Sequence, residues 1–252
     1  MKKAAKKKIS KKTAAEKLPD FILHLEELRF RIIAVIVFFI AAFFISFFYC
    51  GAIMEFLQRP ISGAAEKLYY FRVYEKFTTY LKVSAAAALF FSVPFFLIQL
   101  WGFVKPALDS KERNFFAWGL IAAPAVFYGG AFFAYKVMLP SAFSFFAGFA
   151  GQDNIQPVWG MTDYFGFLSS VIMLTGAVFL LPLVMLLLMK AGIIKYETVS
   201  KARAYIIIAI FIIAAVFSPP DVISQMLVAV PLYLLFEVSL LAGRAIKNKN
   251  QG

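Results

Sequence analysis

The sequence predicts an all-α integral membrane protein, and two observations carry that prediction. First, 62% of the 252 residues are hydrophobic and 16% are charged, whereas soluble domains average roughly 45–50% apolar and about 25% charged residues. Second, the few charges gather in short segments that separate long uncharged runs. A soluble domain of this composition would expose large apolar patches and aggregate, so a lipid bilayer is the solvent that this chain requires.

Four uncharged runs are long enough to cross a bilayer as single helices. They cover residues 32–49, 83–104, 114–135 and 164–189. A helix needs roughly 18 apolar residues to cross a hydrocarbon core about 30 Å thick. Each run reaches that length, so we expect four transmembrane helices at these positions.

The last apolar region is interrupted by the sequence Ser218-Pro219-Pro220-Asp221. The apolar run before it, residues 204–217, would rise only about 21 Å as a helix. Two consecutive prolines cannot continue a helix. We therefore predict that the fifth and sixth transmembrane helices are short and are joined by a tight turn. A re-entrant hairpin is the alternative, and it would give the same topology.

The distribution of lysine and arginine predicts the orientation in the membrane. If the amino terminus is cytoplasmic, 20 of the 26 basic residues lie in cytoplasmic segments and 6 lie on the outer side. Cytoplasmic loops of membrane proteins carry an excess of basic residues. The count therefore predicts that both termini are cytoplasmic and that the number of crossings is even.

The chain is predicted to consist of one membrane domain, residues 18–244, with a tail at each end. Residues 1–17 hold eight basic residues and are expected to be disordered. Such a tail would contact anionic lipid, at about 1 kcal/mol per basic residue near the surface, and a specific binding partner is the alternative. Residues 245–252 form the carboxy-terminal cytoplasmic tail. Because the membrane domain is nearly neutral, the net charge of +12 does not indicate nucleic-acid binding.

Residues that enzymes and metal sites need are scarce. The chain has one cysteine, Cys50, and one histidine, His24, which cannot form an internal disulfide or a Cys/His metal site. Neither a GxxxxGK[ST] phosphate-binding loop nor an HExxH motif is present in the sequence. We therefore predict that the protein is not an enzyme and needs no cofactor. A membrane-embedded hydrolase would have to use His24.

Residues 20–31, directly before the first uncharged run, have an amphipathic helical pattern. Apolar residues recur at helical spacing, while Glu27 and Arg31 lie one turn apart on the polar side. This pattern predicts an interfacial helix that leads into the membrane. Its simplest role is anchoring, with Glu27 and Arg31 forming an ion pair.

A second group of polar and aromatic residues occupies the segment 101–113. An interfacial aromatic belt explains Trp101 and Phe103. Glu112 is different, because an acid adds nothing to the topology of a basic cytoplasmic loop. Glu112 and Glu27 would form a pair of carboxylates on the cytoplasmic side. Guanidinium is the cation whose geometry matches a carboxylate best.

A third group of polar residues lies in the last apolar region. Asp221 is expected to cap the final helix, which contributes on the order of 1 kcal/mol. Gln225 and Glu237 follow within the apolar run. An acid at membrane depth costs about 2.5–3.5 kcal/mol on insertion scales and is a functional candidate by default. A polar contact with a neighbouring helix explains Glu237 equally well.

Proline interrupts four of the six predicted helices, at Pro94, Pro124, Pro182 and Pro231. Proline kinks a helix or opens it locally. Four such bends predict a curved, cupped bundle rather than a straight one.

Several of these residues form motifs that occur in the same order in one known family. The motifs are His24-Leu25-x-Glu27-Leu28-Arg29-x-Arg31, Arg59-Pro60, Trp101-x-Phe103-x-x-Pro106-x-Leu108, Glu112-Arg113, Pro182, Ser218-Pro219-Pro220-Asp221 with Ser224-Gln225, and Pro231 with Phe236-Glu237. In these positions the chain resembles the TatC family, the receptor component of the twin-arginine protein translocase. The resemblance extends from about Phe21 to Arg244.

The resemblance implies six helices in a concave, glove-like bundle in the bacterial cytoplasmic (inner) membrane. It implies a receptor for the Ser-Arg-Arg-x-Phe-type signal peptides of folded proteins, with transport driven by the proton-motive force. Single-span TatA-type and TatB-type subunits are the implied partners, and a homo-oligomer within the receptor complex is expected. A polytopic secondary transporter for small molecules is the alternative. It would need a polar site at mid-depth, where only Gln225 and Glu237 are available.

The resemblance also implies roles for individual residues. Glu27 and Glu112 are the carboxylates expected to meet the two arginines of the signal peptide. The residues expected to shape the same surface are Arg29, Phe103, Pro106 and Arg113. Those expected to have structural or partner-contact roles are Pro60, Asp221, Gln225 and Glu237.

One position departs from the family pattern. Many members carry a glutamate two residues before the proline of the fourth helix, and this chain has Leu180 there. Gln225 and Glu237 are the polar residues available to replace it. No proton-relay role is therefore predicted for the fourth helix.

Overall fold

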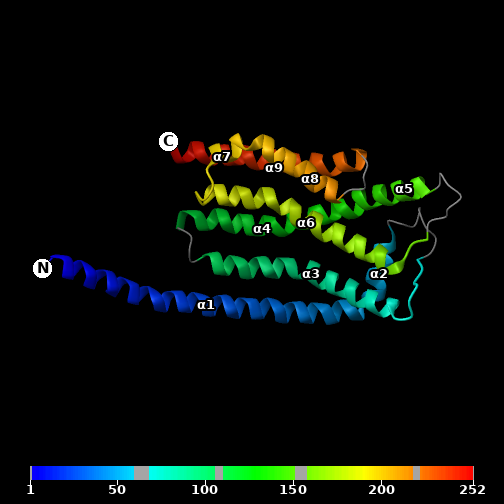
Figure 1. Cartoon of the computed structure of the whole chain (residues 1–252), viewed down its shortest axis with the longest axis horizontal. Coiled ribbons are helices and arrows are strands. Elements are labelled where there is room, and N and C mark those ends of the chain that lie inside the picture. Colours follow the sequence, from blue (N-terminus) through cyan, green and yellow to red (C-terminus); the bar gives the residue numbers. More distant parts are fainter. Residues whose placement is uncertain (1, 60–67, 106–109, 151–157, 218–221, 252) are drawn as a thin grey trace.

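The computed structural model describes residues 2–59, 68–105, 110–150, 158–217 and 222–251. These residues form helices and contain no β-strand (Figure 1). The helices are α1 (Lys2–Phe48), α2 (Cys50–Gln58), α3 (Glu75–Val104), α4 (Ser110–Phe133), a π-helical segment (Ala134–Met138), α5 (Leu139–Ala150), α6 (Met161–Lys190), α7 (Tyr196–Lys201), α8 (Arg203–Phe217) and α9 (Val222–Gln251). The all-α class predicted from composition is confirmed.

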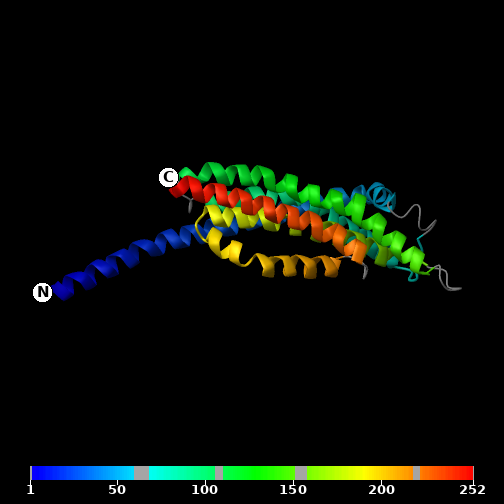
Figure 2. The same cartoon turned by 90° about the horizontal axis from the view of Figure 1, so that it is seen from above.

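The long helices lie side by side in one curved bundle (Figures 1 and 2). Helix α1 packs on α3, α4 packs on α6, and α9 packs on both α6 and α8. Both ends of the chain lie at the same end of the bundle, which we call the terminal end. The last turn of α3 and the first turn of α4 lie there too. The shared position of the chain ends agrees with an even number of crossings.

Five helical segments are long and apolar enough to cross a membrane. They are Leu25–Phe48, Glu75–Val104, Phe115–Gly148, Met161–Lys190 and Val228–Ala245, and Arg203–Val216 is a shorter apolar helix. The four long runs predicted from sequence therefore lie in helices, apart from Tyr49, which separates α1 from α2. The fifth helix, α8, is short as predicted. The sixth, α9, was predicted to be short, but it runs from Val222 to Gln251 and so continues beyond the apolar region into the carboxy-terminal segment.

The third membrane helix also differs from its prediction. The uncharged run ended at Tyr135, but α4, the π-helical segment and α5 form one continuous helical stretch through Lys136. The Lys136 ammonium lies 5.8 Å from the centroid of the Tyr135 ring, a cation–π distance. The Tyr135 hydroxyl donates to the Phe56 carbonyl at 2.7 Å. These contacts allow a charged residue to sit inside the helix rather than mark its end.

Helix α1 begins at Lys2 and so runs through residues 2–17, for which composition predicted disorder. Alanine and lysine are both good helix formers, and this segment consists largely of these two residue types. A helix that starts there continues without interruption into the membrane-spanning part of α1. The domain boundaries at residues 17 and 244 stay predictions.

The four predicted proline interruptions all lie inside helices: Pro94 in α3, Pro124 in α4, Pro182 in α6 and Pro231 in α9. Proline lacks the N–H that would bond the carbonyl four residues earlier. At Pro94 that carbonyl belongs to Phe90, and the Tyr128 hydroxyl of α4 donates to it at 3.2 Å. A neighbouring helix thus satisfies the group that the proline leaves unpaired.

The end of the bundle opposite the termini is fastened by a buried carboxylate that the sequence did not single out. Glu75, at the start of α3, is 9% exposed. Its Oε2 accepts the backbone N–H of Phe71 at 2.7 Å and that of Arg72 at 3.1 Å. Its Oε1 accepts the N–H of Thr162, in the first turn of α6, at 3.3 Å. One side chain therefore connects the segment before α3 to the start of α6.

Backbone pairing reinforces this connection. The Tyr69 N–H donates to the Trp159 carbonyl at 2.9 Å, and the Met161 N–H donates to the Tyr69 carbonyl at 2.7 Å. Next to them the hydroxyls of Thr79 and Thr162 lie 2.7 Å apart. The start of α3 and the start of α6 are held together by these bonds, and the position of both helices depends on them.

We predict that Glu75→Gln destabilises the fold. An amide nitrogen would then face one of the backbone N–H groups that the carboxylate now accepts, which leaves that donor without an acceptor. We expect the Tm of the purified protein to fall by about 2–8 °C, measured by thermal unfolding in detergent. Glu55→Gln, at an exposed position of α2, is the matched control and should leave Tm unchanged. Equal Tm values for both variants would contradict the fastening role of Glu75.

Candidate functional site

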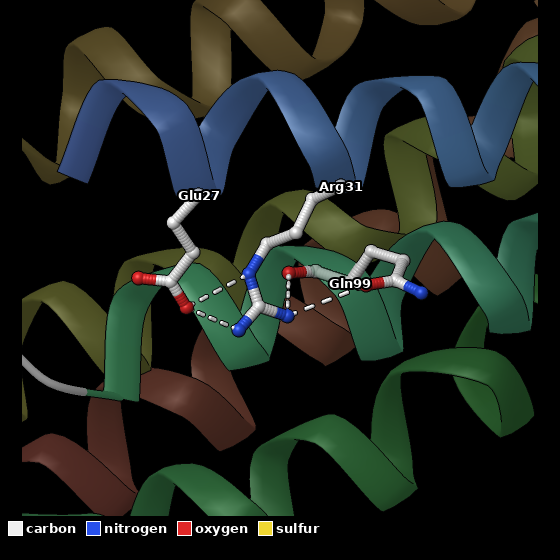
Figure 3. A network of polar contacts seen from close by, with 3 residues as sticks. All are labelled: Glu27, Arg31 and Gln99. Atoms are coloured by element: carbon white, nitrogen blue, oxygen red, sulfur yellow. Dashed lines mark hydrogen bonds and ion pairs between the residues drawn. The ribbon is translucent and has the colours of Figure 1, made fainter. Parts of the chain in front are cut away.

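Glu27 and Arg31 project from α1 toward α3 near the terminal end of the bundle (Figure 3). They lie one helical turn apart, the spacing at which side chains on a helix meet. The Arg31 Nε donates to Glu27 Oε1 at 3.2 Å, and Nη2 donates to the same oxygen at 2.5 Å. The ion pair that the sequence offered as the simplest role for these residues is present.

The opposite edge of the same guanidinium reaches α3. Arg31 Nη1 lies 3.3 Å from the Oε1 atom and 3.5 Å from the backbone carbonyl of Gln99. Arg31 is 24% exposed and Glu27 is 37% exposed. The pair is therefore partly shielded from water but remains open to a ligand. Sequence reasoning missed Gln99, because a single glutamine within an apolar helix gives no periodic signal.

Gly102 provides the space for this guanidinium. A methyl group at residue 102 would lie 1.9 Å from Arg31 Nη1 and 2.5 Å from its Cζ, far inside van der Waals contact. A side chain at residue 102 would occupy the space that the guanidinium fills in this structure. The close approach of Arg31 to α3 therefore depends on Gly102 as much as on its hydrogen-bond partners.

Other predicted site residues lie nearby in the fold. Phe103 is half-buried in the last turn of α3, and Arg29 on α1 and Arg113 on α4 are exposed. Glu112 lies in the first turn of α4, but its side chain is outside the described residues, as is Pro106. The rings of Trp101 and Phe116 stack with centroids 6.2 Å apart, which fixes the end of α3 against the start of α4.

Apolar hollows follow α1 and α3 away from the Glu27–Arg31 pair. The first, of about 480 Å³, begins at Phe30. It shares Phe38 and Ala41 with a second hollow of about 410 Å³. The second shares Ile53 and Phe91 with a third, of about 550 Å³, between α2, α3, α4 and α6. No charged side chain is among the described residues that line them.

Glu237 makes a polar contact with the neighbouring helix, the second of the two roles considered for it. Both of its carboxylate oxygens accept from Arg203 of α8, with Nε at 2.9 Å from Oε1 and Nη2 on Oε2. The glutamate is 17% exposed and the arginine 47%. A charged pair at this position explains how α9 continues past an acid.

Gln225 has a similar role further along the same helix pair. Its Nε2 donates to the Phe211 carbonyl of α8 at 3.1 Å. The polar residues considered as replacements for the missing fourth-helix acid at Leu180 thus both bond to α8. Pro60 and Asp221, the remaining predicted residues, lie outside the described part of the chain.

The arrangement at the terminal end suits binding rather than bond chemistry. It offers the Glu27 carboxylate, the Arg31 guanidinium and aromatic surface next to the apolar hollows. Within the described residues no cluster of three or more His, Cys, Asp or Glu side chains is placed to hold a metal ion.

Sequence comparison finds close relatives along almost the whole chain. The family model described as "Sec-independent protein translocase protein (TatC)" matches residues 23–231. The protein of that name from Desulforapulum autotrophicum is 34% identical over 237 residues, which cover 93% of this chain and 87% of the relative. The one from Haemophilus influenzae is 33% identical over 232 residues, covering 91% and 90%.

The solved structures that this chain resembles belong to the same family as its sequence relatives. A crystal structure of the twin-arginine translocase receptor TatC in DDM superposes with a TM-score of 0.76 at 34% identity. The match covers 87% of this chain and 99% of that one. A second crystal structure of the same receptor gives a TM-score of 0.74 at 33% identity, covering 89% and 99%.

We predict that Gly102→Ala destabilises the protein only while Arg31 is present. With Arg31 in place the new methyl group forces the guanidinium off Gln99. In an Arg31→Ala background the methyl has room and favours the helix. We expect a coupling free energy of about 1 kcal/mol between the two positions, from a double-mutant cycle of unfolding midpoints in detergent. Additive effects would show that the guanidinium does not lie over Gly102.

We predict that charge removal at either partner of the Arg203–Glu237 pair loosens the contact between α8 and α9. Arg203→Gln and Glu237→Gln should each lower Tm by about 2–4 °C. The double exchange Arg203→Glu with Glu237→Arg should recover much of the loss, because it restores opposite charges at the same place. Thermal unfolding of the four proteins checks this, and a double exchange no more stable than the single variants contradicts it.

Proposed function

Because the chain belongs to the TatC family of Sec-independent protein translocase proteins, we propose that it is the receptor subunit of a twin-arginine translocase. In this role it binds the twin-arginine signal peptides of folded precursor proteins at the terminal end of the bundle. It passes them to a transport step driven by the proton-motive force. It acts by recognition and does not catalyse a reaction.

The observation that carries the proposal is the environment of Glu27. Its carboxylate is already bound to a guanidinium in a two-donor contact, the geometry that a signal-peptide arginine would adopt. It is partly shielded, so a charged hydrogen bond there is stronger than one in open water. Glu112, in the first turn of α4, is proposed as the carboxylate for the second arginine. Arg29, Phe103, Pro106 and Arg113 are proposed to shape the surface around both.

The apolar hollows support binding of the rest of the signal peptide. The first hollow begins at Phe30, three positions after Glu27 on α1, so the hollows start close to the carboxylate. A twin-arginine signal continues into a hydrophobic stretch. That stretch would gain affinity along α1 and α3 by packing its side chains into these hollows.

The proposed orientation places the terminal end in the cytoplasm. Its support is the excess of basic residues in the segments at that end and the common position of both chain ends in the structure. The protein is then a multi-pass inner-membrane protein with both termini inside, where the lysine-rich segment 1–17 faces anionic lipid.

Partner subunits are proposed to contact other parts of the chain. TatA-type and TatB-type single-span proteins would contact the end of the bundle opposite the termini and the helices α8 and α9. The residues proposed for these contacts are Pro60, Asp221, Gln225 and Glu237. Further copies of the chain would complete the receptor complex. A small-molecule transporter has less support, because the polar residues Gln225 and Glu237 each bond to α8.

We predict that Glu27→Gln and Glu112→Gln each weaken binding of a labelled Ser-Arg-Arg-x-Phe signal peptide. Loss of one charge-assisted contact should raise Kd by roughly 10- to 100-fold, measured by fluorescence anisotropy with the protein in detergent. Glu26→Gln is the matched control, because Glu26 is an exposed acid directly beside Glu27. It should change Kd by less than about twofold.

The double variant decides the assignment. Peptide binding that survives in Glu27→Gln/Glu112→Gln, in a protein that still inserts into membranes, would remove both residues from the proposed site. Equal losses in Glu26→Gln and Glu27→Gln would show that only the overall charge of α1 matters.

A further inference from the structure

We propose that Arg31 is an internal competitor for the signal-peptide arginine. In the structure Arg31 donates two hydrogen bonds to Glu27. An incoming guanidinium displaces it toward Gln99, so Arg31 sets the affinity threshold that a ligand must exceed. This inference rests on the proposed function, since it concerns the same carboxylate.

The contacts of Arg31 are unequal, which favours exchange. On the Glu27 side two N–H groups meet one carboxylate oxygen, the shorter contact being 2.5 Å. On the Gln99 side the same guanidinium makes two long contacts, at 3.3 and 3.5 Å, with neutral oxygens. The ionised partner makes the stronger contact with Arg31, and the Gln99 oxygens lie close enough to accept the guanidinium once it leaves Glu27.

The path for the exchange is open. The guanidinium lies over Gly102, where no side chain stands between Arg31 and the backbone of α3. Once it leaves Glu27 it can shorten its bonds to Gln99 without moving either helix. The released carboxylate is partly exposed and meets a ligand that brings the same planar set of donors.

The competition has a defined thermodynamic consequence. Displacing Arg31 costs the same for every ligand that binds Glu27 in its place, so it lowers all affinities by one factor. The ratio between an arginine ligand and a lysine ligand is unchanged. The Kd of a weaker cationic segment then rises above the working concentration of that segment. The Kd of a twin-arginine signal stays below its working concentration.

Two substitutions test the proposal because they must act in opposite directions. Arg31→Gln removes the competitor and should lower Kd for the labelled twin-arginine peptide by roughly two- to tenfold. Gln99→Leu removes a partner of the displaced guanidinium and should raise Kd by a similar factor. A purely structural role for the network would weaken binding in both variants.

Controls separate competition from general charge effects. Lys105→Gln removes one positive charge at an exposed position near the end of α3, and it should change Kd by less than about twofold. Arg31→Lys keeps the charge but loses the two-donor contact. Its Kd should therefore lie between those of the wild type and of Arg31→Gln. The affinity of a twin-lysine peptide for Arg31→Gln should exceed its affinity for the wild type by the same factor as that of the twin-arginine peptide. If Arg31→Gln does not fold, Arg31→Lys and Gln99→Leu should still change Kd in opposite directions.

The outcomes distinguish this inference from the proposed function. If Glu27→Gln loses the peptide and Arg31→Gln also binds it more weakly than the wild type, the receptor assignment stands and the competitor role is overturned. A change in the arginine-to-lysine ratio in Arg31→Gln overturns it as well. If the wild type does not bind the peptide, or Glu27→Gln binds it equally well, both proposals fail.

Discussion

The rest of this structure depends on one electrostatic constraint: a carboxylate that is partly or fully shielded from water needs a partner within the protein. An unpaired acid at membrane depth costs about 2.5–3.5 kcal/mol on insertion scales. Glu75 meets this constraint with backbone N–H groups at the starts of α3 and α6. Glu237 meets it with Arg203. Glu27 meets it with Arg31, which also reaches α3. Each acid thereby joins two segments of the bundle, and the acids fix how the apolar helices are placed.

Most of the helical architecture was predictable because apolar runs and charge asymmetry reflect the bilayer directly. Composition gave the all-α class, and the uncharged runs located the long helices. One error arose where a charge was taken as the end of a helix. Lys136 lies inside the helical stretch that continues α4, beside the Tyr135 ring. The Tyr135 hydroxyl donates to the Phe56 carbonyl, a contact between distant segments that a pattern of single residues does not record.

The candidate site was predictable in part for the same reason. The ion pair of Glu27 with Arg31 follows from their spacing of one helical turn, whereas the binding role of Glu27 is a proposal that rests on the family resemblance. Gln99 and Gly102 were not predicted, since an isolated glutamine or glycine within an apolar helix has no distinctive pattern. Their importance comes from where α1 crosses α3. The fastening by Glu75 escaped notice likewise, because its acceptor role involves backbone groups of two distant segments.

If Glu27 exchanges Arg31 for an arginine of the signal peptide, the exchange takes place at the junction of α1 and α3. The most direct test is an experimental structure of the protein with a bound twin-arginine signal peptide. We expect a peptide guanidinium on Glu27, with Arg31 turned onto Gln99 and the helices unmoved. A bound peptide whose arginines lie elsewhere, with Arg31 still on Glu27, would contradict it.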